Sequence, residues 1–281
     1  MIVNQNLIEF KAGIQQGGEQ IGGGYRGKIK GFSKGARARM IKRISSLKEY
    51  PVMWQDFTFA DDVMESLTIE EQAVYSSNCL KLFKRLIETA YSGSINGIWR
   101  REWETRKSGN LKGQECPHFH MLLGKKGLTE KNYRDVCLIL AQVWVAITKT
   151  AHKKALAVAI SEKSYRWLVN NKMAQIYVSK YVAKEEMHED DNFSRGRYWG
   201  FIGKPEKGEQ EEIKLTTLMS IEFRRLFRRY LKKGKLKKLT RHNTCGFWLI
   251  IPRHIIKRME EFILAKLKDI ALNQCLEGVP F

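Results

Sequence analysis

Stretches with the character of β-strands alternate with helical stretches between residues 51 and 204, and this alternation limits the folds that the chain can adopt. Thr68 followed by Glu71 forms a capping box at the start of one helix, and Thr129 is placed to cap another. Strands are expected at residues 51–60, 96–104, 116–124, 155–160 and 196–204, and helices at 68–91, 129–150 and 171–186. We therefore expect an α+β fold with a central antiparallel sheet flanked by helices.

The segments on either side of this region differ from it in composition. Residues 1–50 hold a basic, glycine-rich stretch over 11–35, which we expect to be a mobile arm on DNA phosphates, and a helix over 36–49. After a charged linker, a basic amphipathic helix is expected at 214–240, a strand at 244–252 and a closing helix at 253–272. The sequence therefore predicts an N-terminal arm and helix at 1–50, a core domain at 51–204, and a basic, helical C-terminal extension at 205–281 that binds DNA or a partner.

The glycine-rich arm contains an apparent nucleotide-binding motif. Gly22–Lys28, GGGYRGK, matches both G-x-G-x-x-G and the first seven positions of a P-loop. A P-loop needs Ser or Thr at the next position to hold magnesium, but Ile29 stands there and no apolar strand precedes the glycines. We therefore expect no nucleotide site in the arm.

The charge of the chain points to a polyanionic partner. It carries 50 Lys and Arg residues against 30 Asp and Glu residues, a formal net charge of +20. Such a surplus repels itself unless it meets a polyanion, most commonly nucleic acid, although a generally basic protein or an anionic-membrane binder is the alternative. Five scattered cysteines argue against a disulfide framework and a thiolate zinc site. The sequence shows no signal peptide and no apolar run of spanning length, so we expect a cytosolic protein without a membrane span.

Two histidines stand two residues apart in an apolar run, CPHFHMLL, residues 116–123. Residues i and i+2 of a strand share a face, so His118 and His120 point the same way and could bind one metal ion. Two buried histidines bonded to the backbone are the alternative. A third ligand could come from Glu102 or Glu104, which share a face of the preceding strand. Mixed imidazole and carboxylate ligands admit magnesium, manganese, iron or zinc.

The expected helix at 171–186 combines phenols with ammonium groups. Tyr177, Lys180, Tyr181 and Lys184 have the spacing i, i+3, i+4 and i+7, so they share one helical face. A solvated amphipathic face explains the same pattern. A phenol is a weak nucleophile at neutral pH, and a metal or a nearby cation would activate it. The histidine strand and this helix together hold the groups needed for tyrosine transesterification of DNA.

Three motifs in this order resemble the HUH endonucleases, and among them the rolling-circle replication initiators (Rep proteins) of small phages and plasmids. FTFA at 57–60 looks like their first-strand motif, and WRREWE at 99–104 followed by CPHFHMLL is similar to their W-x-x-E and P-H-x-H segment. YVSKYVAK at 177–184 looks like their nucleophile helix. The resemblance covers roughly residues 31–204 and implies the ferredoxin- or RRM-like fold of the HUH endonucleases.

The resemblance also implies roles for individual residues. His118 and His120 would bind a divalent ion, Mg²⁺ or Mn²⁺, with Glu102 as third ligand and Glu104 as its alternative. Tyr177 and Tyr181 match the paired tyrosines of the gene A type of phage initiator, and Lys180 matches the lysine between them.

The implied activity is sequence-specific nicking and joining of single-stranded or hairpin origin DNA through a 5′-phosphotyrosine. The protein would act in the cytoplasm of a bacterial host. A host polymerase would extend the 3′-OH and a host helicase would unwind the duplex, because nothing after residue 204 resembles a helicase.

Three other functions fit the same residues. A relaxase or a single-strand transposase of the same superfamily shares the metal and the tyrosine, whereas in a non-catalytic DNA-binding protein the same site would be structural or degenerate. The C-terminal extension adds a cluster of arginines that could contact origin DNA or a partner, or form a solvated helix face: Arg224, Arg225, Arg228 and Arg229.

Overall fold

The computed structural model describes most of the chain between residues 29 and 208 and scattered stretches outside it. The described residues are 2–4, 7–11, 29, 31–49, 51–148, 160–161, 163–168, 186–188, 191–208, 210–212, 225, 240–243, 246–250, 257, 261–262, 264–265, 268–269 and 272. The chain divides into unit 1, which comprises Met1–Gly22, Ser45–Lys48 and Lys207–Phe281, and unit 2, which comprises Gly23–Ile44 and Glu49–Glu206. This division differs from the three consecutive parts expected, because residues from both ends of the chain share the sheet of unit 1.

Unit 2 is built on a five-stranded sheet in which every pair of neighbours is antiparallel. The strand order is β7 (Tyr165–Trp167), β4 (Met53–Phe57), β6 (Glu115–Lys125), β5 (Ile95–Thr105) and β9 (Trp199–Ile202). β5 and β6 are each 11 residues long and pair over their whole length, so they form the longest ladder of the sheet. The expected α+β fold with a central antiparallel sheet is confirmed.

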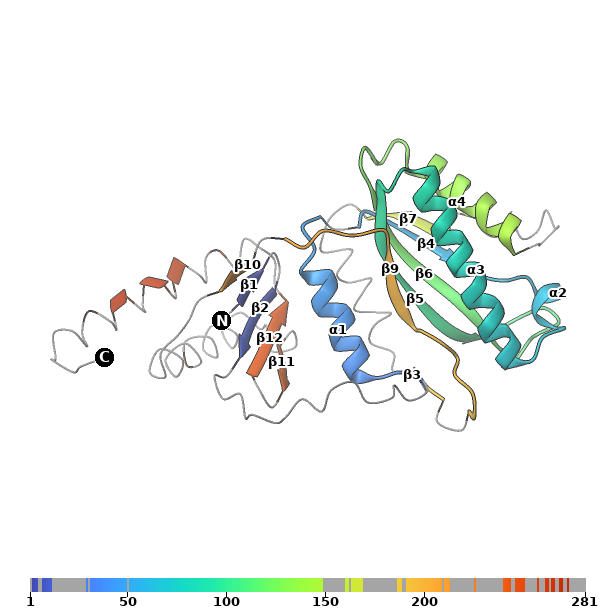
Figure 1. Ribbon diagram of the computed structural model, residues 1–281, viewed down its shortest axis with the longest axis horizontal. Coiled ribbons are helices and arrows are strands. Elements are labelled where there is room, and N and C mark those ends of the chain that lie inside the picture. The colour runs from blue at the N-terminus through green and yellow to red at the C-terminus, as the bar shows by residue number, and fades with distance from the viewer. Residues whose placement is uncertain are drawn as a thin grey trace. The chain divides into compact units, whose positions relative to one another are not determined.

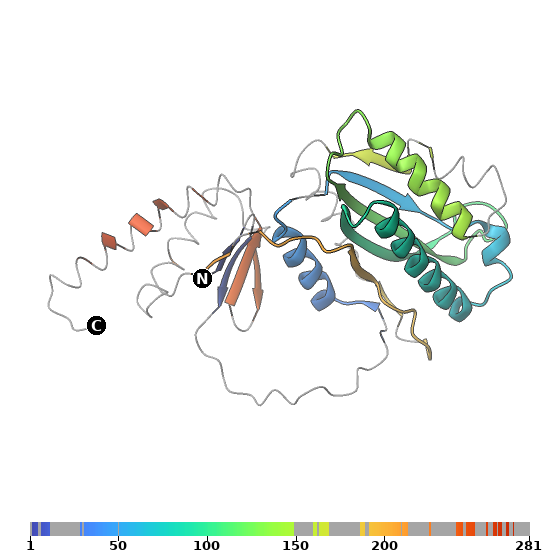
Figure 2. The same ribbon diagram turned by 45° about the horizontal axis from the view of Figure 1, so that its top comes forward.

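Two helices, α3 (Ile69–Ala90) and α4 (Tyr133–Ile147), lie side by side over one face of this sheet (Figures 1 and 2). Phe57 and Phe119 point from the sheet into this layer, where they meet Phe83 of α3 and Trp144 of α4. These four aromatic side chains are buried, and burial of an aromatic ring is among the largest single contributions to a core. The short helix α2 (Asp61–Met64) adds Met64 to the same core.

The sequence locates the start of α3 correctly but not that of α4. Thr68 and Glu71 form the expected capping box, in which the Thr68 hydroxyl accepts from the Glu71 N–H and the Glu71 carboxylate accepts from the Thr68 N–H. The expected cap at Thr129 is wrong, because α4 begins at Tyr133 after Asn132. There the Asn132 side chain accepts a hydrogen bond from the Thr129 backbone N–H at 2.7 Å and closes a turn before the helix.

The remaining elements of unit 2 correct two expectations. β3 (Gly31–Phe32) pairs with β8 (Glu186–Met187), and α1 (Lys34–Ser45) follows at once, so the expected mobile arm at 11–35 is wrong over residues 31–35. Glu186 lies in a strand and not at the end of a helix. Most of the strand expected at 155–160 and the rest of the helix expected at 171–186 lie outside the described residues.

Unit 1 contains a second antiparallel sheet. Its order is β10 (Gln210–Glu212), β1 (Ile2–Asn4), β2 (Leu7–Lys11), β12 (Gly246–Ile250) and β11 (Thr240–Asn243). β12 confirms the strand expected at 244–252. Thr240, expected to end a helix, lies instead in β11. Among the residues that the structure describes, no helix has the length and apolar character needed to cross a membrane.

Candidate metal centre

Three neighbouring strands bring the acidic and imidazole side chains to one face of the unit 2 sheet. Residues that pair directly across an antiparallel ladder share a face. Asp56 of β4 pairs with His120 of β6, and Glu102 of β5 pairs with His118 of β6. Phe119, between the histidines, points to α3 and α4, so these polar side chains lie on the opposite face of the sheet.

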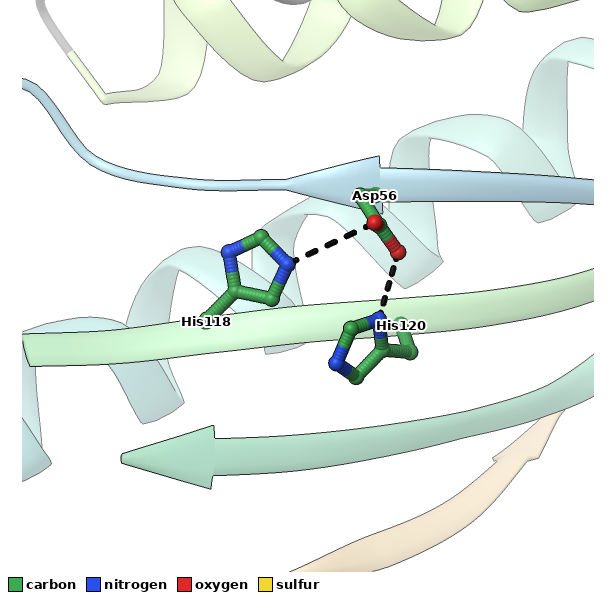
Figure 3. A group of neighbouring side chains, drawn as sticks. All are labelled: Asp56, His118 and His120. Carbon is green, nitrogen blue, oxygen red and sulfur yellow. Dashed lines mark hydrogen bonds and ion pairs between the residues drawn. The ribbon is translucent and has the colours of Figure 1, made fainter. Parts of the chain in front are cut away.

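Asp56 contacts both histidines (Figure 3). Its Oδ1 lies 2.5 Å from His120 Nδ1, and its Oδ2 lies 3.6 Å from His118 Nε2. The Trp54 indole N–H also donates to Asp56 Oδ1 at 2.7 Å. One ligand atom from each of Asp56, His118 and His120 can be chosen so that all lie within 4.8 Å of one another. The three side chains therefore form a compact donor set that is partly open to solvent.

Glu102 contacts the same imidazole from the other side. Its Oε2 lies 3.0 Å from His120 Nε2, the ring nitrogen that does not face Asp56. Glu102 Oε2 also lies 3.5 Å from the Arg100 guanidinium. Arg100, Glu102 and His120 are all buried. His120 of β6 therefore lies between two carboxylates, one from each strand that neighbours β6: Asp56 of β4 and Glu102 of β5.

The mutual pairing of these groups shifts their protonation equilibria. Burial opposes the ionisation of Asp56, but hydrogen bonds and charge from His118 and His120 outweigh it and lower the carboxyl pKa. Burial likewise opposes the imidazolium form of His120, but hydrogen bonds and charge from Asp56 and Glu102 outweigh it and raise the imidazole pKa. The two carboxylates therefore favour a positive charge at this imidazole.

The donor set fits a small divalent cation. Nitrogen and oxygen ligands bind such ions at about 2.0–2.2 Å, so two ligands at a right angle are about 3 Å apart. The 3.6 Å separation of His118 and Asp56 suits a shared ion. The 2.5 Å separation of His120 and Asp56 is that of a hydrogen bond and must widen slightly to admit one. Two imidazoles and a carboxylate accept manganese, magnesium or zinc.

The structure places some of the residues expected from the sequence and leaves others outside its description. His118, His120 and Glu102 lie together as expected, whereas Glu104 pairs with Cys116 further along the ladder and its side chain is exposed. The expected catalytic residues Tyr177, Lys180 and Tyr181 lie outside the described residues, as do Arg224, Arg228 and Arg229. Arg225 is helical and exposed.

Asp56 is the member of the site that sequence reasoning misses. Its strand, β4, is expected from the alternating and aromatic residues of 51–60, but its partner His120 is 64 positions away. Aspartate is depleted in strands, so an aspartate in the middle of one was the available signal of a special role.

Comparisons with known proteins identify no relative, so the function must be inferred from the site itself. The chain matches no protein-family model, no curated protein and no solved structure.

Proposed function

We propose that the protein is a metal-dependent enzyme that nicks and joins single-stranded DNA through a tyrosine, as an initiator of rolling-circle replication with the HUH endonuclease fold. The observation that carries this proposal is the convergence of Asp56, His118 and His120 on a sheet face that helices α3 and α4 leave uncovered. The net charge of +20 supports a polyanionic substrate. Tyr177 and Tyr181 supply the nucleophiles that the resemblance to Rep proteins assigns.

The proposed reaction is a transesterification. The oxygen of Tyr177 or Tyr181 gives up its proton to solvent or a nearby base and attacks the phosphorus of a phosphodiester. The bond between phosphorus and O3′ breaks, the O3′ oxygen takes up a proton, and the 5′ phosphate remains esterified to the tyrosine. Joining is the reverse reaction with a 3′-OH of the strand that is to be closed.

Each residue of the site has a role in this reaction. Asp56, His118 and His120 would hold a divalent ion, Mg²⁺ or Mn²⁺, and Glu102 would orient His120. When bound, the ion would polarise the phosphoryl oxygens and offset the charge that develops on them. Lys180, between the tyrosines, would offset the same charge. Direct ligation by Glu102 stays a prediction.

The partners follow from the products. The 3′-OH released at a single-stranded or hairpin origin is a primer for a polymerase, which a bacterial host would supply together with a helicase. The four arginines of the C-terminal extension, including the exposed Arg225, are candidates for contacts with origin DNA.

A covalent-adduct assay tests the enzyme directly. The protein is incubated with Mn²⁺ and labelled single-stranded oligonucleotides that carry candidate origins, and adducts are separated on a denaturing gel. We expect an adduct that is lost in His120→Ala, after chelation, and in the double variant Tyr177→Phe/Tyr181→Phe. Tyr133→Phe, in the first turn of α4, is the control and should form the adduct normally.

The same assay separates the alternatives. If Tyr177→Phe still forms an adduct and Tyr181→Phe does not, Tyr181 is the first nucleophile. A closed circular product from one oligonucleotide indicates an initiator, whereas transfer to a second DNA molecule indicates a transposase. DNA binding without an adduct for any origin or ion would support the non-catalytic alternative and overturn the proposal.

A further inference from the structure

The buried side chain of Arg100 lies between two carboxylates that come from distant parts of the chain. One guanidinium nitrogen lies 3.5 Å from Glu102 Oε2, and the other lies 3.5 Å from Glu186 Oε2. The guanidinium also stacks over the Phe32 ring, 4.7 Å from its centroid. Only 1% of the Arg100 side chain is exposed, so water screens these charges weakly.

Glu186 is held to strand β5 by its backbone as well as by Arg100. The β5–β9 ladder ends where Arg100 pairs with Trp199, so β9 does not reach Trp103. There the Trp103 N–H donates to Glu186 Oε1 at 2.8 Å. Glu186 thus takes the place of a strand neighbour and fixes the start of β8 against β5.

The contacts continue from Arg100 to the metal centre. Glu102, which pairs with Arg100, lies 3.0 Å from His120 Nε2, and His120 Nδ1 lies 2.5 Å from Asp56. An unbroken set of charged contacts therefore runs from Glu186 through Arg100 and Glu102 to the residues of the candidate metal centre.

Glu186 lies close in the sequence to the two proposed nucleophiles. Glu186 follows Tyr181 by five residues and Tyr177 by nine. An extended chain spans at most about 3.6 Å per residue. The Cα atom of Tyr181 can therefore be no more than about 18 Å from that of Glu186, and the Cα atom of Tyr177 no more than about 32 Å. A fixed Glu186 therefore limits the reach of both proposed nucleophiles, and that of Tyr181 more tightly.

We propose that Arg100 is a positioning residue that ties the tyrosine-bearing segment to the metal centre by bridging Glu186 and Glu102. The inference rests on the proposed function for its effect on catalysis. Arginine suits this role because its planar guanidinium presents separate donors to two carboxylates, whereas lysine presents one point charge.

Replacing Glu186 by glutamine tests the bridge without removing its hydrogen-bond acceptor. Burial raises the pKa of the Glu186 carboxyl, although the Trp103 N–H, His188 and Arg100 favour the charged form. A neutral amide is therefore compatible with this buried position. Glu88→Gln is the matched control, because Glu88 also accepts a backbone N–H, from Gly203 at 2.7 Å, but on α3. Arg85→Lys, exposed on α3, is the control for Arg100→Lys.

The first measurement needs no catalytic activity. Hydrogen exchange followed by mass spectrometry reports on peptides that cover residues 171–185, and calorimetry reports the affinity for Mn²⁺. We expect Glu186→Gln to increase exchange in those peptides and to leave the Mn²⁺ affinity within about twofold, while Glu88→Gln changes neither. Unchanged exchange in Glu186→Gln would overturn the proposed bridge, whether or not the protein cleaves DNA.

The second measurement follows the adduct. We expect Glu186→Gln and Arg100→Lys each to slow adduct formation on the order of tenfold, since small misplacements of reacting groups are costly. The double variant should be no slower than the slower single variant, because both remove one bridge. Mass spectrometry should find a smaller share of adduct on Tyr181. If the variants form the adduct at the same rate as the controls, with the same share on Tyr181, the positioning role is refuted. Failure of the wild-type protein to form any adduct would refute the proposed function alone.

Discussion

His120 distinguishes the two carboxylates beside it by its ring nitrogens. Nδ1 faces Asp56, which also contacts His118, and Nε2 faces Glu102. A ring turned by 180° would present carbon atoms to both carboxylates, so the hydrogen bonds define its orientation. In this orientation Asp56 is the carboxylate that contacts both histidines, and Glu102 accepts the N–H at Nε2 of His120. Such outer partners fix the orientation of a metal-binding imidazole.

Substitution of the two carboxylates separates a ligand from an orienting group. We expect Asp56→Asn to lower the Mn²⁺ affinity at least on the order of tenfold, and Glu102→Gln to lower it less, because glutamine can still accept the His120 N–H. Isothermal titration calorimetry measures both. Glu104→Gln, exposed on the same face of β5, should bind as the wild type does. A larger loss in Glu102→Gln than in Asp56→Asn would make Glu102 the third ligand, as the resemblance to Rep proteins implies.

At the residue scale, the sequence reveals what is local. His118 and His120 are recognisable because they stand at i and i+2 of one strand, and the period of a strand is enough to put them on one face. Asp56 needs the register of β4 against β6, which pairs it with His120 and which no local pattern contains. The same limit applies to Arg100, whose partner Glu186 is 86 positions away.

At the scale of elements, the start of α3 is a local signal that the structure confirms. Thr68 Oγ1 accepts from the Glu71 N–H at 3.3 Å, and Glu71 Oε2 accepts from the Thr68 N–H at 2.8 Å. We expect Thr68→Ala to lower the free energy of unfolding by about 1 kcal/mol, as is typical of a lost N-cap. Urea denaturation measures it. Thr129→Ala is the control, since the sequence predicts Thr129 as a cap but Thr129 does not cap α4, and an equal loss there would contradict the assignment.

The capping box also makes the stability of α3 depend on pH. The hydrogen bond from the Thr68 backbone, followed by that from its hydroxyl, lowers the pKa of the Glu71 carboxyl below its ordinary value of 4.5. A carboxyl with a lowered pKa in the folded state stabilises the protein above its unfolded pKa, and this contribution is lost as the pH falls through the folded pKa. The effect therefore belongs to the acid range below 4.5.

A comparison of two variants isolates this contribution. We expect Glu71→Gln to have a lower urea midpoint than the wild type at about pH 6. The difference should narrow as the pH falls through the lowered pKa of the wild-type carboxyl, because protonation removes the charge that the capping box stabilises. Glu70→Gln, in the same turn but outside the capping box, should show a smaller difference throughout this pH range. A gap between Glu71→Gln and the wild type that is constant with pH would mean that the carboxylate charge plays no part.

At the scale of the whole molecule, the sequence predicts the class of fold better than its division into units. The alternation of strands and helices between residues 51 and 204 is enough for an antiparallel α+β fold. It cannot show that β2 pairs with β12, with Phe10 opposite Phe247, because that ladder joins the two ends of the chain. A strand pattern states which face is apolar but not which strand lies beside it.

The net charge of +20 predicts how the whole molecule responds to salt. Each phosphate that a basic side chain neutralises adds about −0.7 to the slope of log affinity against log salt for single-stranded DNA. We expect a steep slope for an origin oligonucleotide, measured by fluorescence anisotropy between about 50 and 200 mM salt.

Replacing Arg224, Arg225, Arg228 and Arg229 by glutamine should make the slope shallower by up to about 2.8 if all four contact phosphates. Four exposed lysines of unit 2 replaced by glutamine control for the loss of positive charge in general. A slope that the arginine variant leaves unchanged would assign DNA binding to other basic residues, and a slope near zero for the wild type would exclude phosphate contacts as the reason for the charge.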